Sequence, residues 1–160
     1  MDATIVARGP QIILVQRENW HEFYQAELVE LTKAAGEYLL AFEHVGSTAV
    51  PGLAGKPVID ILAGAATLQN ADAIAERLKR LGYVQIPFRP ATPDAGESGS
   101  DRLFFLKRAI DSSEGVEPSH PGYNIHVVDI DRFSKDDQLL LRDYLRAHPE
   151  LAAEYARLKC

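Results

Sequence analysis

The stretch HVGSTAVPGLAGKPVIDIL, residues 44–62, decides the fold. A β-branched and aromatic run, 41–45, leads into it and predicts a strand. A loop rich in glycine and proline follows, and the apolar run 58–62 predicts a second, buried strand interrupted by Asp60. Burying a carboxylate is costly unless it is paired, hydrogen-bonded or bound to a metal. Asp60 is therefore a candidate functional residue, with pairing to a nearby cation as the structural alternative.

The turn after the first of these strands is a candidate phosphate site. Gly46 permits a tight backbone turn, and Ser47 and Thr48 add hydroxyl groups. Backbone amides left free at such a turn bind anions. An ordinary turn is the alternative interpretation. Lys56 could supply a point charge to a phosphate, and Arg102 a bidentate contact, unless both are simply solvated.

On both sides of this stretch, strand and helix patterns alternate along the chain. Apolar spacing predicts helices over 19–35, 70–81, 134–148 and from Pro149 to the end. Short β-branched or aromatic runs predict strands at 11–15, 41–45, 58–62, 83–88, 103–106 and 124–128, and 91–101 reads as a mobile loop. The order indicates an α/β or α+β domain with a mixed β-sheet and flanking helices, which we expect mainly on one face.

Length and composition bound the class of protein. A chain of 160 residues, 46% hydrophobic and 25% charged, fits a single globular domain spanning 1–160. The net charge of −6 disfavours a nucleic-acid partner, although an acidic chain can still hold a local basic pocket. Cys160 is the only cysteine, which excludes an intramolecular disulfide. With no predicted membrane span and no basic signal region at the start, we expect a cytoplasmic protein without a membrane partner.

Two histidines extend the candidate site around Asp60. His126 lies inside the apolar run 124–128, and His44 is the second-last residue of the predicted strand 41–45, before the glycine turn. A histidine in a strand is commonly a core or edge residue. Taken together, however, the side chains of Asp60, His126 and His44 form a nitrogen and oxygen set that suits a divalent cation.

The same residues carry a resemblance to known proteins. A Gly-Ser turn followed by an Asp-bearing strand resembles the nucleotidyltransferase superfamily of the polymerase-β type. The run 44–62 more narrowly resembles the signature of the GrpB family, whose function is uncharacterised. The resemblance covers nearly the entire chain and extends to further residues: Trp20, Phe23, Arg102-Leu103-Phe104-Phe105 before Lys107, and Asn124-Ile125-His126-Val127. It implies a nucleotidyltransferase-like fold, sometimes attached to a kinase of coenzyme A biosynthesis.

One departure from the superfamily pattern limits what the resemblance implies. Nucleotidyltransferases of this type carry a second carboxylate two residues after the first, where this chain has Leu62. Two carboxylates bridge two magnesium ions in the usual geometry. With Asp60 alone, the site must recruit another ligand, hold one metal or have lost transfer activity. Recruitment of His126 would favour manganese or zinc over magnesium, and Glu43 is a further possible carboxylate.

These observations leave three functional hypotheses. The first is binding of a nucleoside triphosphate or another phosphorylated small molecule, with metal-dependent nucleotidyl transfer in which Asp60 acts catalytically. The second is a non-catalytic module that senses a nucleotide or contacts a protein. The third is a single-metal hydrolase that uses His44, Asp60 and His126. The sequence names neither the acceptor nor a protein partner.

Overall fold

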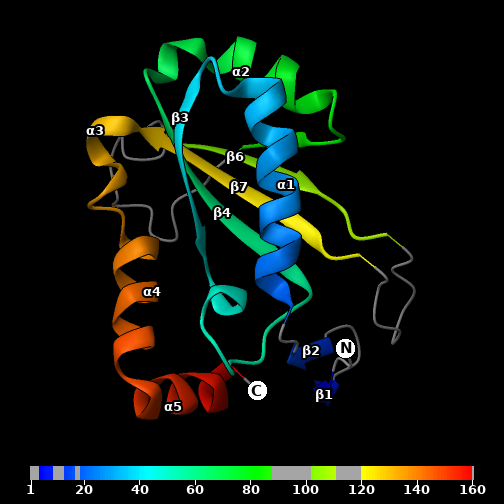
Figure 1. The fold of residues 1–160 in the computed structure, drawn as a ribbon, viewed down its shortest axis with the longest axis vertical. Coiled ribbons are helices and arrows are strands. Elements are labelled where there is room, and N and C mark those ends of the chain that lie inside the picture. Colours follow the sequence, from blue (N-terminus) through cyan, green and yellow to red (C-terminus); the bar gives the residue numbers. More distant parts are fainter. Residues whose placement is uncertain (1–3, 9–12, 17–18, 88–101, 111–119, 160) are drawn as a thin grey trace.

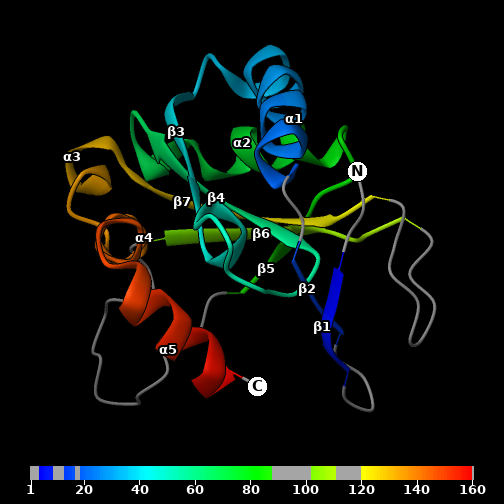
Figure 2. The ribbon, with the colours of Figure 1, turned by 60° about the horizontal axis from the view of Figure 1, so that its bottom comes forward.

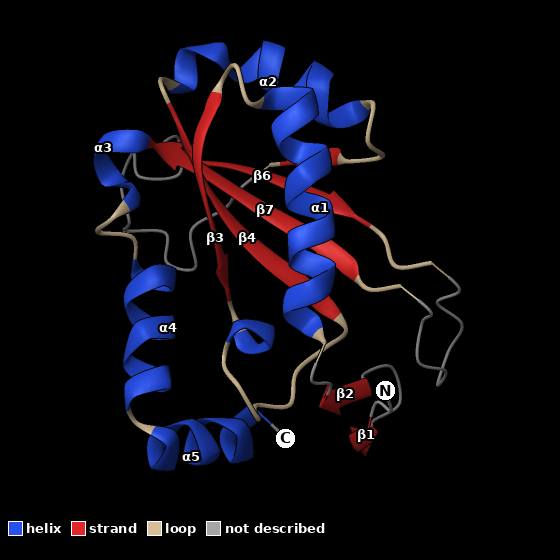
Figure 3. Ribbon diagram, in the orientation of Figure 1, coloured by secondary structure: helices blue, strands red, loops and turns tan. Residues whose placement is uncertain are grey.

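A computed structural model (Figure 1) describes residues 4–8, 13–16, 19–87, 102–110 and 120–159. The elements are β1 (Thr4–Arg8), β2 (Ile13–Gln16), α1 (Trp20–Ala35), β3 (Leu39–Val45), η1 (Ser47–Ala49), β4 (Val58–Ala65), η2 (Leu68–Asn70), α2 (Ala71–Lys79), β5 (Val84–Ile86), β6 (Arg102–Lys107), β7 (Gly122–Asp129), α3 (Ile130–Phe133), α4 (Asp137–Ala147) and α5 (Pro149–Lys159), with η marking a 3₁₀ turn. Figure 3 shows β3, β4, β7 and β6 in the centre with helices around them, and β1 and β2 apart from this sheet.

The main sheet is mixed, as the sequence predicts. Its strand order is β3-β4-β7-β6-β5, in which only β4 and β7 run parallel. The register places Val45, Asp60 and Asn124 side by side on β3, β4 and β7. A separate two-stranded sheet is formed by β1 and β2.

Side chains alternate between the two faces of the main sheet, so each face has its own packing. Ile61, Ile125 and Phe105 lie on the face covered by α1 and α2, within the larger apolar core. Val45 and Leu62 lie on the opposite face, where Phe133 of α3 packs against them. Figure 2 shows α1 and α2 on one side of the sheet, with α4 and α5 on the other.

The expectation that helices lie mainly on one face is therefore wrong. The helix predicted from residue 134 packs its buried residues Arg142 and Leu145 inward, and it leaves Leu140 and Tyr144 about half exposed.

Other predicted elements agree with the structure apart from their ends. The first helix and the predicted strands of the main sheet are present, whereas β1 was not predicted. The predicted strand at 11–15 overlaps β2, and the predicted loop 91–101 lies outside the described residues. None of the helices described here combines the length and apolar character needed to cross a membrane.

Candidate functional site

The centre of the site is the contact between Asp60 and Gly46. The pairing of Val45 with Asp60 brings the end of β3, and the turn that follows it, against the Asp60 side chain. Gly46 has φ 77° and ψ −173°, a conformation that is essentially restricted to glycine. A Cβ atom at Gly46 would lie 2.3 Å from Oδ2 of Asp60. Only a glycine allows the turn to approach the carboxylate this closely.

The Asp60 pocket is a cavity of about 200 Å³ at this contact. Gly46, Ser47 and Asp60 form its sheet side, and Asn124 on β7 donates from Nδ2 to Oδ1 of Asp60 at 3.2 Å. The remaining wall comes from the loop after η1 and from α4 and α5: Val50, Leu53, Gln138, Leu141, Arg142, Leu145 and Tyr155. The pocket therefore has a polar side at the glycine turn and an apolar side at the C-terminal helices.

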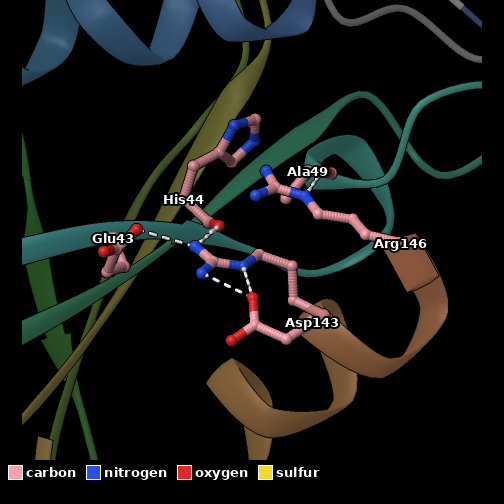
Figure 4. Close-up of polar contacts among 6 residues, drawn as sticks. Glu43, His44, Ala49, Asp143 and Arg146 are labelled. Atoms are coloured by element: carbon pink, nitrogen blue, oxygen red, sulfur yellow. Dashed lines mark hydrogen bonds and ion pairs between the residues drawn. The ribbon is translucent and has the colours of Figure 1, made fainter. Parts of the chain in front are cut away.

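Arg142 connects α4 to β3, the strand that leads into the site, and Figure 4 shows its partners Glu43, His44 and Asp143. Its Nη1 donates to the Glu43 carboxylate at 2.7 Å and to the backbone oxygen of His44 at 3.0 Å. Its Nε and Nη2 donate to Oδ1 of Asp143. Burial acts to lower the pKa of Arg142, but these carboxylates hold it above its usual value. The guanidinium is thus a fixed positive charge at the edge of the pocket.

His126 lies on the same face of the sheet as Asp60, one strand away. It pairs with Leu62, and its ring contacts Phe104 with 4.8 Å between the ring centroids. Burial and the charge of Arg102 lower the pKa of His126 to about 4, against the opposing effect of Asp136. The imidazole is therefore neutral near pH 7, the form in which histidine binds metals.

His44 and Thr48 face away from the Asp60 pocket. His44 pairs with Ile61, so its side chain lies on the opposite face of the sheet from Asp60 and His126. The Thr48 hydroxyl is 2.8 Å from Nε2 of this histidine. The expectation that Thr48 joins Ser47 in binding phosphate is not met by this geometry. The three-residue metal site is also wrong, because the sheet separates His44 from the other two residues.

Lys56 and Arg102 were predicted to contact a phosphate, but neither lines the Asp60 pocket. Lys56 is exposed on the loop before β4. Arg102 lies on β6 and donates to Asp136 at the N-terminus of α4, at 2.5 Å. Arg102 thus links the sheet to α4, and Arg142 is the arginine that borders the Asp60 pocket.

The side chains present fit one cation better than two. Asp60 offers a carboxylate to the pocket, with the Asn124 amide beside it. At the position of a second carboxylate, Leu62 is fully buried against Val45 and Val128. Within the part of the chain that is described, no three His, Cys, Asp or Glu side chains are grouped to hold a metal ion. A single hard cation on Asp60, completed by ligand oxygens and water, is compatible with these surroundings.

The sequence reading missed the contribution of α4 and α5. Gln138, Leu141 or Arg142, and Leu145 recur at steps of three and four residues, which is the spacing of one helix face. This spacing indicates a helix face that could line a site. It does not indicate that this face packs against Gly46 and Ser47, almost a hundred residues earlier in the chain.

Comparisons with solved structures show a nucleotidyltransferase-like fold. The poly(U) polymerase Cid1, in a crystal structure with MgGTP bound, superposes with a TM-score of 0.55 over 91% of this chain and 43% of Cid1, at 13% identity. The conserved protein GrpB from Enterococcus faecalis superposes with a TM-score of 0.69 and 25% identity over 99% of this chain and 80% of that protein. The nucleotidyltransferase-like fold is therefore confirmed.

Sequence comparison defines the family. The profile of the GrpB protein family matches residues 11–160, and the chain belongs to this family. It is 31% identical to the glutamate-rich protein GrpB of Alkalihalophilus pseudofirmus, over 96% of this chain and 82% of that protein. It is 34% identical to the UPF0157 protein YqkA of Bacillus subtilis, over 92% of this chain but 38% of the relative.

Some relatives are much longer than this chain. A dephospho-CoA kinase from Mycolicibacterium paratuberculosis is 29% identical over 96% of this chain and 40% of the kinase. Together with the 38% share of YqkA, this shows that the chain spans well under half of some curated relatives. The family fold therefore occurs within longer proteins, as the resemblance implied.

Proposed function

We propose that this chain binds the phosphate groups of a nucleotide or another phosphorylated metabolite in the Asp60 pocket, together with one divalent cation. The contact between Gly46 and the Asp60 carboxylate carries this proposal. It brings an anion-binding type of turn and a cation-binding carboxylate to the same small cavity.

The shape and charge of the pocket support a phosphate group at the glycine turn. A volume of about 200 Å³ suits a phosphate chain with its cation better than an entire nucleotide. The cation would offset the repulsion between Asp60 and the phosphates, because the guanidinium of Arg142 at the rim is already paired with Glu43 and Asp143. The apolar side chains of α4 and α5 would contact the uncharged part of the ligand.

Cid1 supports the nucleotide as the first ligand to test. Its crystal structures contain MgGTP and a UTP analogue. A sequence identity of 13% with Cid1 supports a shared fold and nothing further. The ligand of this chain is therefore inferred from the Asp60 pocket itself.

Nucleotidyl transfer is a second candidate, favoured by the position of Glu43. This residue pairs with Leu62, beside the place of the absent carboxylate, and its side chain is 43% exposed. In such a reaction an acceptor hydroxyl oxygen would bond to the α-phosphorus, pyrophosphate would leave, and the hydroxyl proton would pass to a carboxylate or to water. In the structure the Glu43 carboxylate accepts a hydrogen bond from Arg142 instead of joining Asp60 as a second metal ligand. The side chains of the site therefore support binding more directly than transfer.

Calorimetric titration with ATP, GTP, CTP and UTP, with and without Mg²⁺, tests the binding proposal. We expect magnesium-dependent binding that is weakened about ten-fold or more in Asp60→Asn, because charge-assisted contacts are lost. Asp131→Asn is the matched control, since Asp131 is exposed on α3. Equal binding by both variants, or binding of none of the four, would refute the proposal. Measuring pyrophosphate release in the same samples separates transfer from binding.

A further inference from the structure

A second cavity lies on the other side of the loop that follows η1. This cavity, the His44 pocket, has a volume of about 600 Å³ and is lined by Trp20, His21, His44, Thr48, Arg146 and the segment 49–53. Such a volume lies in the range of small-molecule sites. Because His44 is on the opposite face of the sheet from Asp60, this pocket is separate from the proposed phosphate site.

His44, which lines this pocket, has an unsatisfied buried polar atom. The residue is 2% exposed, and its Nδ1 is buried without a hydrogen-bond partner in the described part of the chain. Its Nε2 lies 2.8 Å from the Thr48 hydroxyl. If that hydroxyl donates to Nε2, the neutral ring carries its proton on Nδ1 and only this N–H lacks a partner. The reverse arrangement would leave both the hydroxyl proton and Nδ1 unsatisfied, so the first is favoured.

The surroundings of this N–H are electropositive. Burial, together with the charges of His21, Arg146 and Arg142, lowers the pKa of His44 to about 3. Arg146 uses Nε to donate to the backbone oxygen of Ala49 at 2.8 Å. Figure 4 shows its guanidinium extending toward the His44 ring. A neutral N–H donor close to an arginine is a suitable setting for an anionic oxygen.

The rest of the pocket is aromatic and apolar. Trp20 lines it, and His21 stacks over the His44 ring with 6.0 Å between the centroids. The His44 ring also stacks on Tyr24 with 4.9 Å between the centroids, and the Tyr24 ring lies 5.7 Å from that of His21, so the three rings form one cluster that fixes the orientation of the imidazole. The apolar side chains of segment 49–53 complete the wall. These surfaces suit a planar or apolar ligand body.

We propose that the His44 pocket binds a small organic anion, with its carboxylate or phosphate group between the Arg146 guanidinium and Nδ1–H of His44 and its planar body against Trp20. This site does not depend on the function proposed for the Asp60 pocket. Carboxylate and phosphate ligands share the chemistry that the pocket recognises, and the experiment distinguishes them.

The only tryptophan of the chain provides the signal for a test. Trp20 emission would be followed during titration of the full chain with benzoate, with phenyl phosphate and with benzamide, the uncharged analogue of benzoate. We expect a saturable change with benzoate or phenyl phosphate at millimolar concentrations and none with benzamide. The anion that binds more tightly identifies the headgroup.

Variants of Arg146 show whether the change in Trp20 emission arises from binding in the His44 pocket. Arg146→Gln should weaken binding about ten-fold, as expected for loss of a charge-assisted hydrogen bond, and Arg146→Lys should weaken it less. Arg80→Gln, exposed at the end of α2, should bind as the unmodified chain does. Because Arg146 also tethers η1, His21→Ala serves as a second variant that should weaken binding. Equal responses to benzamide, no saturable response to either anion, or an unchanged affinity in Arg146→Gln would each overturn the proposal.

Discussion

Replacing Gly46 by alanine perturbs the contact on which the Asp60 pocket depends. The backbone conformation of Gly46, with φ 77° and ψ −173°, costs about 1–3 kcal/mol for a residue with a Cβ. The new Cβ would also lie 2.3 Å from Oδ2 and 3.0 Å from Cβ of Asp60, so the Asp60 side chain cannot relieve the overlap by rotation alone. Such overpacking adds about 1–3 kcal/mol. The total expected loss is therefore about 2–6 kcal/mol of the free energy of unfolding.

Gly52→Ala is the matched control, because Gly52 also has φ 77° but is exposed. Urea denaturation should show a loss of about 1–2 kcal/mol for this control, the backbone contribution alone. Thermal unfolding should rank the variants in the same order, at about 2–4 °C per kcal/mol for a chain of this length. A double-mutant cycle of Gly46→Ala with Asp60→Gly should recover the steric part of the loss. Equal losses for the two glycine variants, or no coupling in the cycle, would refute the described contact.

Two further predictions concern buried ionisable groups on the other face of the sheet. Lys107→Met should lower the free energy of unfolding by about 3–5 kcal/mol, because it leaves the carboxylate of Glu27, which is 6% exposed, without its cation. Adding Glu27→Gln should restore most of this stability in urea denaturation, and the exposed Lys79→Met should have little effect; a loss that persists in the double variant would contradict the ion pair. The folded-state pKa of His44, about 3, lies below its ordinary value of 6.5, so the unfolded chain binds a proton that the folded chain does not. Stability should therefore decrease as the pH falls from about 6.5 toward 3. In His44→Gln this decrease should be smaller, with a part due to His126 remaining; an unchanged pH profile would show that His44 does not titrate as described.

Local sequence signals predicted most of the main sheet and the first helix. Apolar periodicity and turn residues are local properties, and they placed the strands around Asp60 within a few residues. The distribution of helices over both faces was not predicted, because it depends on which face of α4 meets the sheet. That choice rests on buried Arg142, whose polar contacts with β3 satisfy a residue that an apolar pattern would place outside.

The candidate site was predicted in part for a related reason. Asp60, Gly46 and Ser47 do line one pocket, as the sequence pattern suggested. His44 was grouped with them because the pairing register of β3 and β4 cannot be read from either strand alone. A shift of one residue moves a side chain to the other face, and the observed register pairs Asp60 with Val45 rather than with His44.

The location of a bound divalent cation tests the central claim most directly. Mn²⁺ would be added in substoichiometric amounts with a nucleoside triphosphate to ¹⁵N-labelled protein, and the broadening of each amide signal would be recorded. The account predicts that the amides of Gly46, Ser47 and Asp60 broaden first and that Asp60→Asn removes this selectivity. Broadening that begins in the acidic segment 129–137, or that is the same in Asp60→Asn, would contradict a cation and phosphate site in the Asp60 pocket.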